Sequence, residues 1–217
     1  GKGRAGKGVI ELFRNLNIKE VSKSEFLHQN FNEAVFFHLD TMDYNESIDG
    51  SPFDKKEFYN NPKLYKSIFM DFAKQADIFI AAHYFSPDSP FLFTREDAKH
   101  PEFNLKVIAD ISCDINGPVA STIRSSTVRN PIYGYNPHSE QEDDYMKNEV
   151  IAVMAVDNLP CELPKDASEY FGDELLEKII PLLITGDKDQ IIDNATICKN
   201  GDLTSRFEYL RGFVNES

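Results

Sequence analysis

Three short, nearly continuous apolar runs constrain most strongly how this chain can fold. They are Asp77–Ala82, Leu105–Ile111 and Val150–Val156. Runs of this kind are typical of strands that are covered on both faces, as in a parallel sheet. Segments with helical periodicity alternate with these runs along the chain. The pattern predicts an α/β fold with a doubly wound, mostly parallel sheet and helices on both faces.

A glycine-rich stretch opens the chain, GKGRAGKG over residues 1–8, and apolar residues at helical spacing follow through Leu16. A helix that begins near Gly6 directs free amide donors and the positive end of its dipole toward an anion. Three cations add to this local positive charge, namely Lys2, Arg4 and Lys7. The loop therefore favours a dinucleotide pyrophosphate site and a Rossmann-like sheet. The alternative is a glycine-rich terminal loop that binds nothing.

Such a loop normally follows a strand, so we expect the first strand of the fold to be missing from this chain. The other expected elements are strands over Ile18–Val21 and Ala34–Leu39, a capped helix from Ser22, a surface excursion over residues 40–61, a helix over Pro62–Gln75, a hairpin or loop strand within Thr122–Tyr135, and a long helix over Ala167–Leu183.

The composition argues against two classes of binding partner. A net charge of −13 argues against nucleic acid or an anionic membrane surface, because both need a cationic face. No apolar run approaches the length of a membrane span, and three cysteines and five histidines show no spacing typical of a metal site. We therefore expect a soluble protein in the cytoplasm, with no metal.

The ribose end of the cofactor site is predicted near the second strand. In an NAD site an acidic residue about 20 positions after the loop binds the ribose hydroxyls, and Glu20 is close to that position. Ser22 and Lys23 follow, and a hydroxyl with an ammonium would suit the 2′-phosphate of NADP. The residues slightly favour NADP over NAD. The alternative is a solvated strand end followed by a helix cap.

Two later stretches are more specific: VIADISCD at residues 107–114 and AVDNLPCELPKDASEYFGDEL at residues 155–175. They resemble the lysine-ketoglutarate reductase / saccharopine dehydrogenase family, within the alanine dehydrogenase and transhydrogenase-like superfamily. The glycine loop, the AHYF stretch at residues 82–85 and the NGDL stretch at residues 200–203 fit the same pattern. The resemblance thus extends over nearly the whole chain.

The resemblance implies an oxidoreductase that interconverts lysine plus 2-oxoglutarate with saccharopine, by hydride transfer between NAD(P) and an imine. Carried over by motif, the cofactor-binding residues are Gly3, Arg4, Tyr84, Ile111, Val156, Asp157, Asn158 and Leu159, and the substrate-binding residues are Ser112, Cys113 and Asp114. The ribose contact matches by position alone and falls on Val21 or Ser22. The family's proton-handling lysine and histidine lie in a preceding domain. We therefore expect no catalytic residue in this chain, and the missing N-terminal domain of the same polypeptide as its partner.

The residues leave other interpretations open. Ser112 and Asp114 would otherwise cap a turn before Asn116-Gly117-Pro118, and His83 alone has no identified base or acid as a partner. The chain could also belong to another alanine dehydrogenase-like oxidoreductase, or be a nucleotide-binding regulatory domain without catalysis. We expect one domain over residues 1–217, with residues 186–217 returning toward the absent domain, and a mitochondrial location if the source is an animal.

Overall fold

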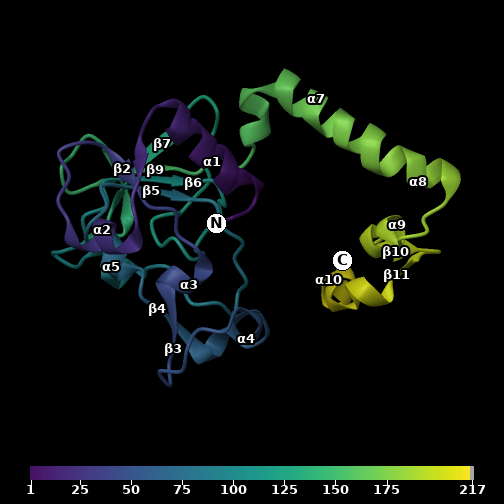
Figure 1. Ribbon diagram of the computed structural model, residues 1–217, viewed down its shortest axis with the longest axis horizontal. Helices are drawn as coiled ribbons and strands as arrows, with labels where there is room; N and C mark the ends of the chain where they lie inside the picture. The colour runs from purple at the N-terminus through teal and green to yellow at the C-terminus, as the bar shows by residue number, and fades with distance from the viewer. Residues whose placement is uncertain (216–217) are drawn as a thin grey trace. The chain divides into compact units, whose positions relative to one another are not determined.

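The computed structural model describes residues 1–215 and contains two compact units (Figure 1). The first unit is Gly1–Leu159 and the second begins at Pro160. Each unit is described separately below.

A five-stranded sheet forms the centre of the first unit. Its strands are, in spatial order, β5 (Ile78–Ala81), β6 (Val107–Asp110), β9 (Ile151–Met154), β7 (Ile132–Asn136) and β8 (Gln141–Asp143). The first three are parallel and correspond to the three apolar runs, so that prediction is confirmed. The strand expected within Thr122–Tyr135 is β7, which pairs antiparallel with β9 and β8. The mixed α/β class and the mostly parallel sheet are confirmed.

The glycine-rich loop leads into α1 (Arg4–Asn15), and a second, parallel pair of strands follows. This pair is β1 (Lys19–Glu20) and β2 (Val35–Phe36), joined by α2 (Lys23–His28). Asn17 has a φ of 56° just after α1, a conformation that asparagine tolerates at a helix end. Ser22 and Glu25 form the expected capping box at the start of α2.

Helices cover both faces of the chain at β2. Phe13 of α1 packs on Phe36 with ring centroids 4.9 Å apart, and Phe72 of α5 (Met70–Ala73) stacks on Phe37 at 6.0 Å. Phe36 and Phe37 are consecutive residues, which point to opposite faces of an extended chain. α1 and α5 therefore lie on opposite faces, as expected of a doubly wound sheet.

The stretch from residue 40 to residue 75 differs from expectation. It contains α3 (Thr41–Tyr44), β3 (Asn45–Ser47), α4 (Lys55–Asn60), a 3-10 turn η1 (Pro62–Leu64), β4 (Tyr65–Ser67) and then α5. The single helix predicted over Pro62–Gln75 is wrong. Tyr65 is 3% exposed and packs edge-on against Phe53 and Phe58, while β4 pairs antiparallel with β3. This packing outweighs the helical periodicity. A further short helix, α6 (Arg95–Ala98), follows with Thr94 as its cap.

The second unit is mainly helical. After the 3-10 turn η2 (Leu159–Glu162), α7 (Pro164–Glu174), a π-helical turn η3 (Leu175–Ile179) and α8 (Ile180–Thr185) follow without interruption, which confirms the long helix predicted over Ala167–Leu183. The remaining elements are α9 (Ile191–Ala195), the hairpin strands β10 (Cys198–Lys199) and β11 (Asp202–Leu203), η4 (Ser205–Leu210) and α10 (Arg211–Asn215). No residue from Pro160 to Asn215 is buried.

Among residues 1–215, no helix has both the length and the apolar character that crossing a membrane requires.

The core of the first unit depends on the central strands. Ile108 of β6 is fully buried, whereas Ile132 of β7 is 45% exposed. Ile108→Ala should lower the free energy of unfolding by about 2–5 kcal/mol because it leaves a cavity. Ile132→Ala, the matched control, should lower it by less than about 1 kcal/mol. Urea denaturation measures both values, and equal losses would contradict this placement of the core.

Candidate functional site

The glycine loop is held tightly against the end of β5. A Cβ on Gly6 would overlap the carbonyl oxygen of Gly1, and a Cβ on Gly1 would collide with the carbonyl oxygen of Ala82. The loop therefore requires glycine at these two positions for close packing. Gly3, by contrast, is open, because a Cβ placed there would have no other atom within 4 Å.

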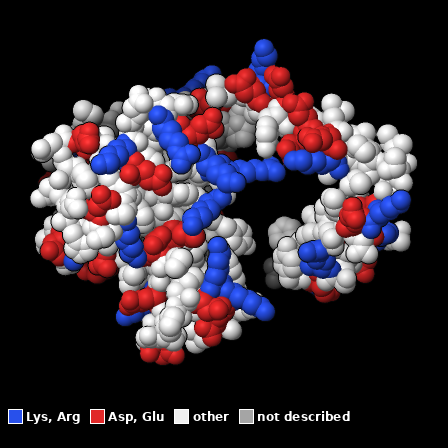
Figure 2. Space-filling view, viewed as in Figure 1, with Lys and Arg blue, Asp and Glu red and all other residues white. Residues whose placement is uncertain are grey.

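Helix α1 begins at this open position. Gly3 is its N-cap residue and supplies no side-chain cap, so the first turn presents backbone amides that no side chain caps. Lys2 lies beside the loop and forms an ion pair of 2.8 Å with Asp40, which lowers the pKa of Asp40. Figure 2 shows acidic and basic side chains interspersed over the visible surface. The first turn of α1 therefore offers uncapped backbone amides, the donors that bind anions at helix N-termini.

The end of β6 is organised by a buried carboxylate. Asp110 is 1% exposed and accepts hydrogen bonds from the backbone amides of Ser112 and Cys113, both at 3.1 Å, and from the hydroxyl of Thr122 at 2.7 Å. Burial raises the pKa of Asp110, although these three donors act in the opposite direction. The carboxylate fixes the turn that contains Ser112 and Cys113.

Cys113 connects this turn to β9. Its φ is 53°, a left-handed conformation that is uncommon for a residue with a side chain, and its thiol donates to the carbonyl oxygen of Ala155 at 3.1 Å. Burial raises the pKa of the thiol, so the thiolate is disfavoured. Cys113 therefore holds the turn after β6 against β9, and its thiol lacks the properties of a nucleophile.

Ser112 connects the ends of β5 and β6. Its hydroxyl donates to the carbonyl oxygen of His83 at 2.9 Å and accepts from the amide of His83 at 3.2 Å. The Nε2 atom of His83 is buried without a hydrogen-bond partner in the described chain. Burial lowers the pKa of His83 to about 4. The ring is therefore neutral at physiological pH. Burial and Asp110 raise the pKa of neighbouring Asp114.

The end of β9 completes the same edge of the sheet. The hydroxyl of Ser126 accepts from the amide of Ala155 at 3.0 Å, and the amide of Ser126 donates to the carbonyl oxygen of Ala155 at 2.8 Å. Val156 is buried directly after this contact, and Asp157, Asn158 and Leu159 follow it. Because β5, β6 and β9 are parallel neighbours, their carboxyl ends lie next to one another.

Most of the residues proposed from the motifs therefore lie along one edge. Those at the three strand ends are Tyr84, Ile111, Ser112, Cys113, Asp114, Val156, Asp157, Asn158 and Leu159. The structure adds three polar residues that position them, namely buried Thr122 and Ser126 and half-buried His83. Only His83 had a sequence signal, its position at a strand end. The contacts of Thr122 and Ser126 depend on folding of the 112–131 loop, which the sequence does not reveal.

Ser22 follows β1, at the start of α2. Its hydroxyl donates to Glu25 at 2.7 Å within the capping box. Lys23 donates to the carbonyl oxygen of Asp43 at 3.0 Å, and Glu20 lies 3.6 Å from Arg14. All three side chains proposed for the ribose end are thus engaged within the protein. No group of histidine, cysteine and carboxylate side chains among residues 1–215 has the arrangement of a metal site.

Comparison with known proteins gives several relatives. The mouse mitochondrial alpha-aminoadipic semialdehyde synthase is 27% identical over 97% of this chain, and the Arabidopsis thaliana alpha-aminoadipic semialdehyde synthase is 29% identical over 73% of it. The lysine-forming, NAD(+) saccharopine dehydrogenase of Schizosaccharomyces pombe is 25% identical over 90% of it. The chain spans 26%, 16% and 41% of these three proteins, respectively. No family model matches the chain.

The close packing of the loop predicts opposite effects at two glycines. Gly6→Ala should lower the free energy of unfolding by about 1–3 kcal/mol, because the added methyl must displace backbone. Gly8 lies in α1 with open space around it, so Gly8→Ala should raise the free energy of unfolding by up to about 1 kcal/mol. Urea denaturation distinguishes the two, and a stabilising Gly6→Ala would contradict the loop geometry.

The buried imidazole predicts a dependence of stability on pH. The pKa of His83 is about 4 in the folded chain against an ordinary value of 6.5, so its contribution to stability is complete above pH 6.5 and is lost as pH falls toward 4. Between about pH 7.5 and about pH 5 this loss should be about 2 kcal/mol. His83→Leu should show a loss smaller by that amount in urea titrations at both pH values. An unchanged His83→Leu profile would refute the assignment.

Proposed function

We propose that this chain, a relative of the aminoadipic semialdehyde synthases and lysine-forming saccharopine dehydrogenases, is the nicotinamide dinucleotide-binding part of an oxidoreductase of lysine metabolism. The observation that carries the proposal is the uncapped N-terminus of α1 in a loop where Gly1 and Gly6 leave no room for a side chain. It adjoins Ala82, at the edge where β5, β6 and β9 end. Open α/β sheets bind their ligands at that edge.

The roles follow from chemistry and position. The backbone at Gly3 and the Arg4 side chain would hold the pyrophosphate. Tyr84, Ile111 and the Val156–Leu159 segment would contact the rest of the dinucleotide, which when bound supplies the hydride donor or acceptor. Ser112, Cys113 and Asp114 would face the substrate. The hydroxyl of Ser112 already contacts the backbone amide and carbonyl oxygen of His83, which positions Ser112 between the ends of β5 and β6.

The reaction proposed is the interconversion of lysine plus 2-oxoglutarate with saccharopine. It breaks or forms a C–N bond through an imine and therefore needs proton transfer as well as hydride transfer. The buried neutral His83 and the raised pKa of Asp114 do not supply a matched acid–base pair open to substrate. We propose that the proton-transfer groups come from the rest of the polypeptide, since the chain spans about a quarter of its mouse relative.

The choice between NADP and NAD depends on the start of α2. The sequence slightly favours NADP through Ser22 and Lys23. The capping role of Ser22 and the bond from Lys23 to Asp43 mean that a 2′-phosphate would have to compete for both side chains. If it succeeds, Lys23→Ala should weaken NADPH binding and leave NADH binding unchanged.

Calorimetric titration with NADH and NADPH tests the proposed function. Gly3→Ala adds a methyl where the protein leaves open space, so folding should be preserved while close approach of the pyrophosphate is blocked. We expect a loss of affinity of about tenfold or more, equivalent to about 1.4 kcal/mol. Gly8→Ala, also in open space but one turn further along α1, is the control and should bind as wild type. Equal affinity of Gly3→Ala and wild type would exclude the loop as the pyrophosphate site.

A further inference from the structure

One arginine of the first unit contacts two turns that each contain a residue in the left-handed conformation. Asn116 has a φ of 53° in the turn after β6, and Glu140 has a φ of 56° between β7 and β8. Arg95, the first residue of α6, donates from Nη2 to Oδ1 of Asn116 at 3.0 Å and from Nη1 to Oε2 of Glu140 at 3.1 Å. The guanidinium therefore ties the turn after β6 to the β7–β8 hairpin.

Glu140 would keep a cationic partner without Arg95. Lys99 forms an ion pair of 2.7 Å with Oε1, the other carboxylate oxygen of Glu140. The side chains of Arg95, Lys99 and Glu140 are 43%, 28% and 33% exposed, and ion pairs at such exposed positions contribute little to stability. A substitution of Arg95 should therefore leave the fold intact and act mainly through the lost contact to Asn116.

The turn that Arg95 contacts closes tightly on Asp114. The amide of Gly117 donates to the carbonyl oxygen of Asp114 at 2.9 Å. A Cβ on Gly117 would lie 2.7 Å from both the Cβ and the carbonyl oxygen of Asp114. Because Asn116 directly precedes Gly117, a change of backbone conformation at Asn116 must displace Asp114 as well.

The same turn is anchored from the interior of the unit by Thr122. The amide of Asn116 donates to the carbonyl oxygen of Thr122 at 3.0 Å, and the hydroxyl of Thr122 donates to the buried carboxylate of Asp110 at 2.7 Å. Asn116 is thus held through its backbone by the interior of the unit and through its side chain by Arg95, which lies at the surface.

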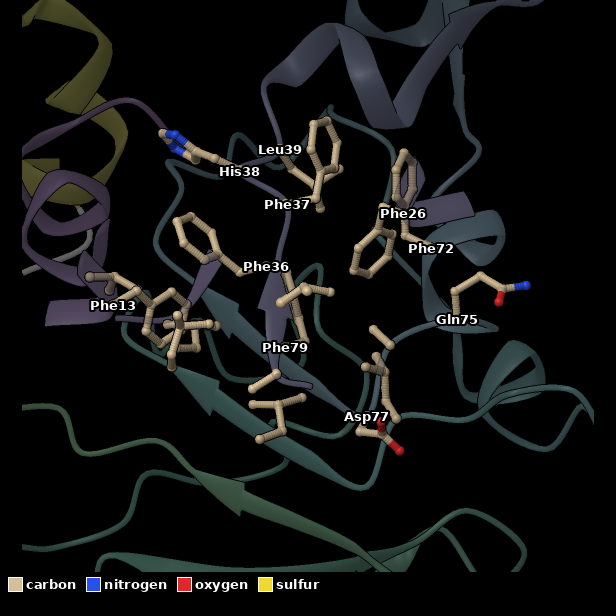
Figure 3. A pocket seen from close by; sticks show the side chains of 18 of the residues that line it. Phe13, Phe26, Phe36, Phe37, His38, Leu39, Phe72, Gln75, Asp77 and Phe79 are labelled. Carbon is tan, nitrogen blue, oxygen red and sulfur yellow. The ribbon is translucent and has the colours of Figure 1, made fainter. Parts of the chain in front are cut away.

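A large apolar cavity of the first unit does not border this turn. Its volume is about 660 Å³, and Figure 3 shows the phenyl rings of Phe36, Phe72 and Phe79 among the side chains that line it. Its lining comes from residues 1–105 and does not include Arg95. A substitution of Arg95 therefore leaves the lining of this cavity intact.

We propose that Arg95 is a positioning residue for Asp114. By holding Asn116 in the left-handed conformation, its guanidinium sets the position of the carboxylate that faces the substrate. The inference rests on the proposed function, which places Asp114 toward the substrate. Asparagine tolerates the left-handed conformation but does not prefer it, so the bond from Arg95 favours this conformation over others. Glycine would adopt it without such a partner.

Hydrogen exchange of the full-length polypeptide without nucleotide tests whether Arg95 holds the turn. Arg95→Ala should speed exchange of the amides of Asn116 and Gly117 by about tenfold, because both amides donate to acceptors that fix this turn. Lys99→Ala is the matched control, since it removes a contact to Glu140 and keeps the contact from Arg95 to Asn116. It should change this exchange by less than about twofold.

Steady-state kinetics with saccharopine and saturating NAD or NADP tests whether the held turn serves the substrate. Arg95→Ala should raise KM for saccharopine about tenfold and change kcat less than about threefold, because Asp114 is placed to bind substrate rather than to transfer a proton. The dinucleotide Kd should stay within about twofold of wild type. Lys99→Ala should match wild type in all three quantities.

A rescue variant distinguishes positioning from a general structural role. Asn116→Gly reaches the left-handed conformation unaided, so its KM should be near that of wild type. In this background Arg95→Ala should change KM by less than about twofold. A residue that merely stabilised the fold would lose active enzyme in both backgrounds and leave KM unchanged.

Three results would overturn the inference. Unchanged exchange at Asn116 and Gly117 in Arg95→Ala would show that the arginine does not hold the turn. Faster exchange with an unchanged KM would show that the turn does not set Asp114 for the substrate. A rise in KM that persists in the Asn116→Gly background would assign the effect of Arg95 to another contact. A wild-type polypeptide that converts no saccharopine would instead overturn the proposed function, a failure that appears without any substitution.

Discussion

Parallel pairing of β5, β6 and β9 is the constraint on which the rest of the first unit depends. It places the carboxyl ends of the three strands side by side, so the turns that follow each strand meet at one edge. Ile108 and Val153 at the centre of this sheet are fully buried, so the strands that carry these turns are anchored in the core. The glycine loop and α1 then rest on the end of β5. Residues that are far apart in the sequence are thereby brought together at this edge.

Buried polar groups, rather than surface charges, hold this edge in shape. Asp110 is tied to its own turn and to Thr122, Ser112 joins β5 to β6, and Ser126 joins the 112–131 loop to β9. Each contact satisfies a group that would otherwise be buried without a partner, which is costly in an apolar interior. The exposed ion pairs around them contribute little to stability by comparison. The motif residues are therefore positioned before any ligand binds.

Patterns among neighbouring residues in the sequence predicted several strands, the glycine loop and a helix cap. The three apolar runs, the glycine loop before α1 and the capping box at Ser22 all identify structures that form from nearby residues. The single helix predicted over Pro62–Gln75 was wrong because Tyr65 pairs with Ser47 and packs on Phe53, and periodicity does not report such distant partners. The motif residues were found through family resemblance. The sequence did not reveal the contacts of Thr122 and Ser126 that position these residues, because those contacts depend on how the 112–131 loop folds.

The site that we propose for a dinucleotide lies at the ends of β5, β6 and β9, beside the glycine loop. Amide chemical-shift mapping of the full-length polypeptide with NADH or NADPH tests this assignment directly. We expect shifts at Gly3, across Ile111–Asp114 and at Asp157, with those of Phe36 and Phe79 unchanged. Shifts concentrated at Phe36 and Phe79, with the glycine loop unaffected, would contradict the assignment.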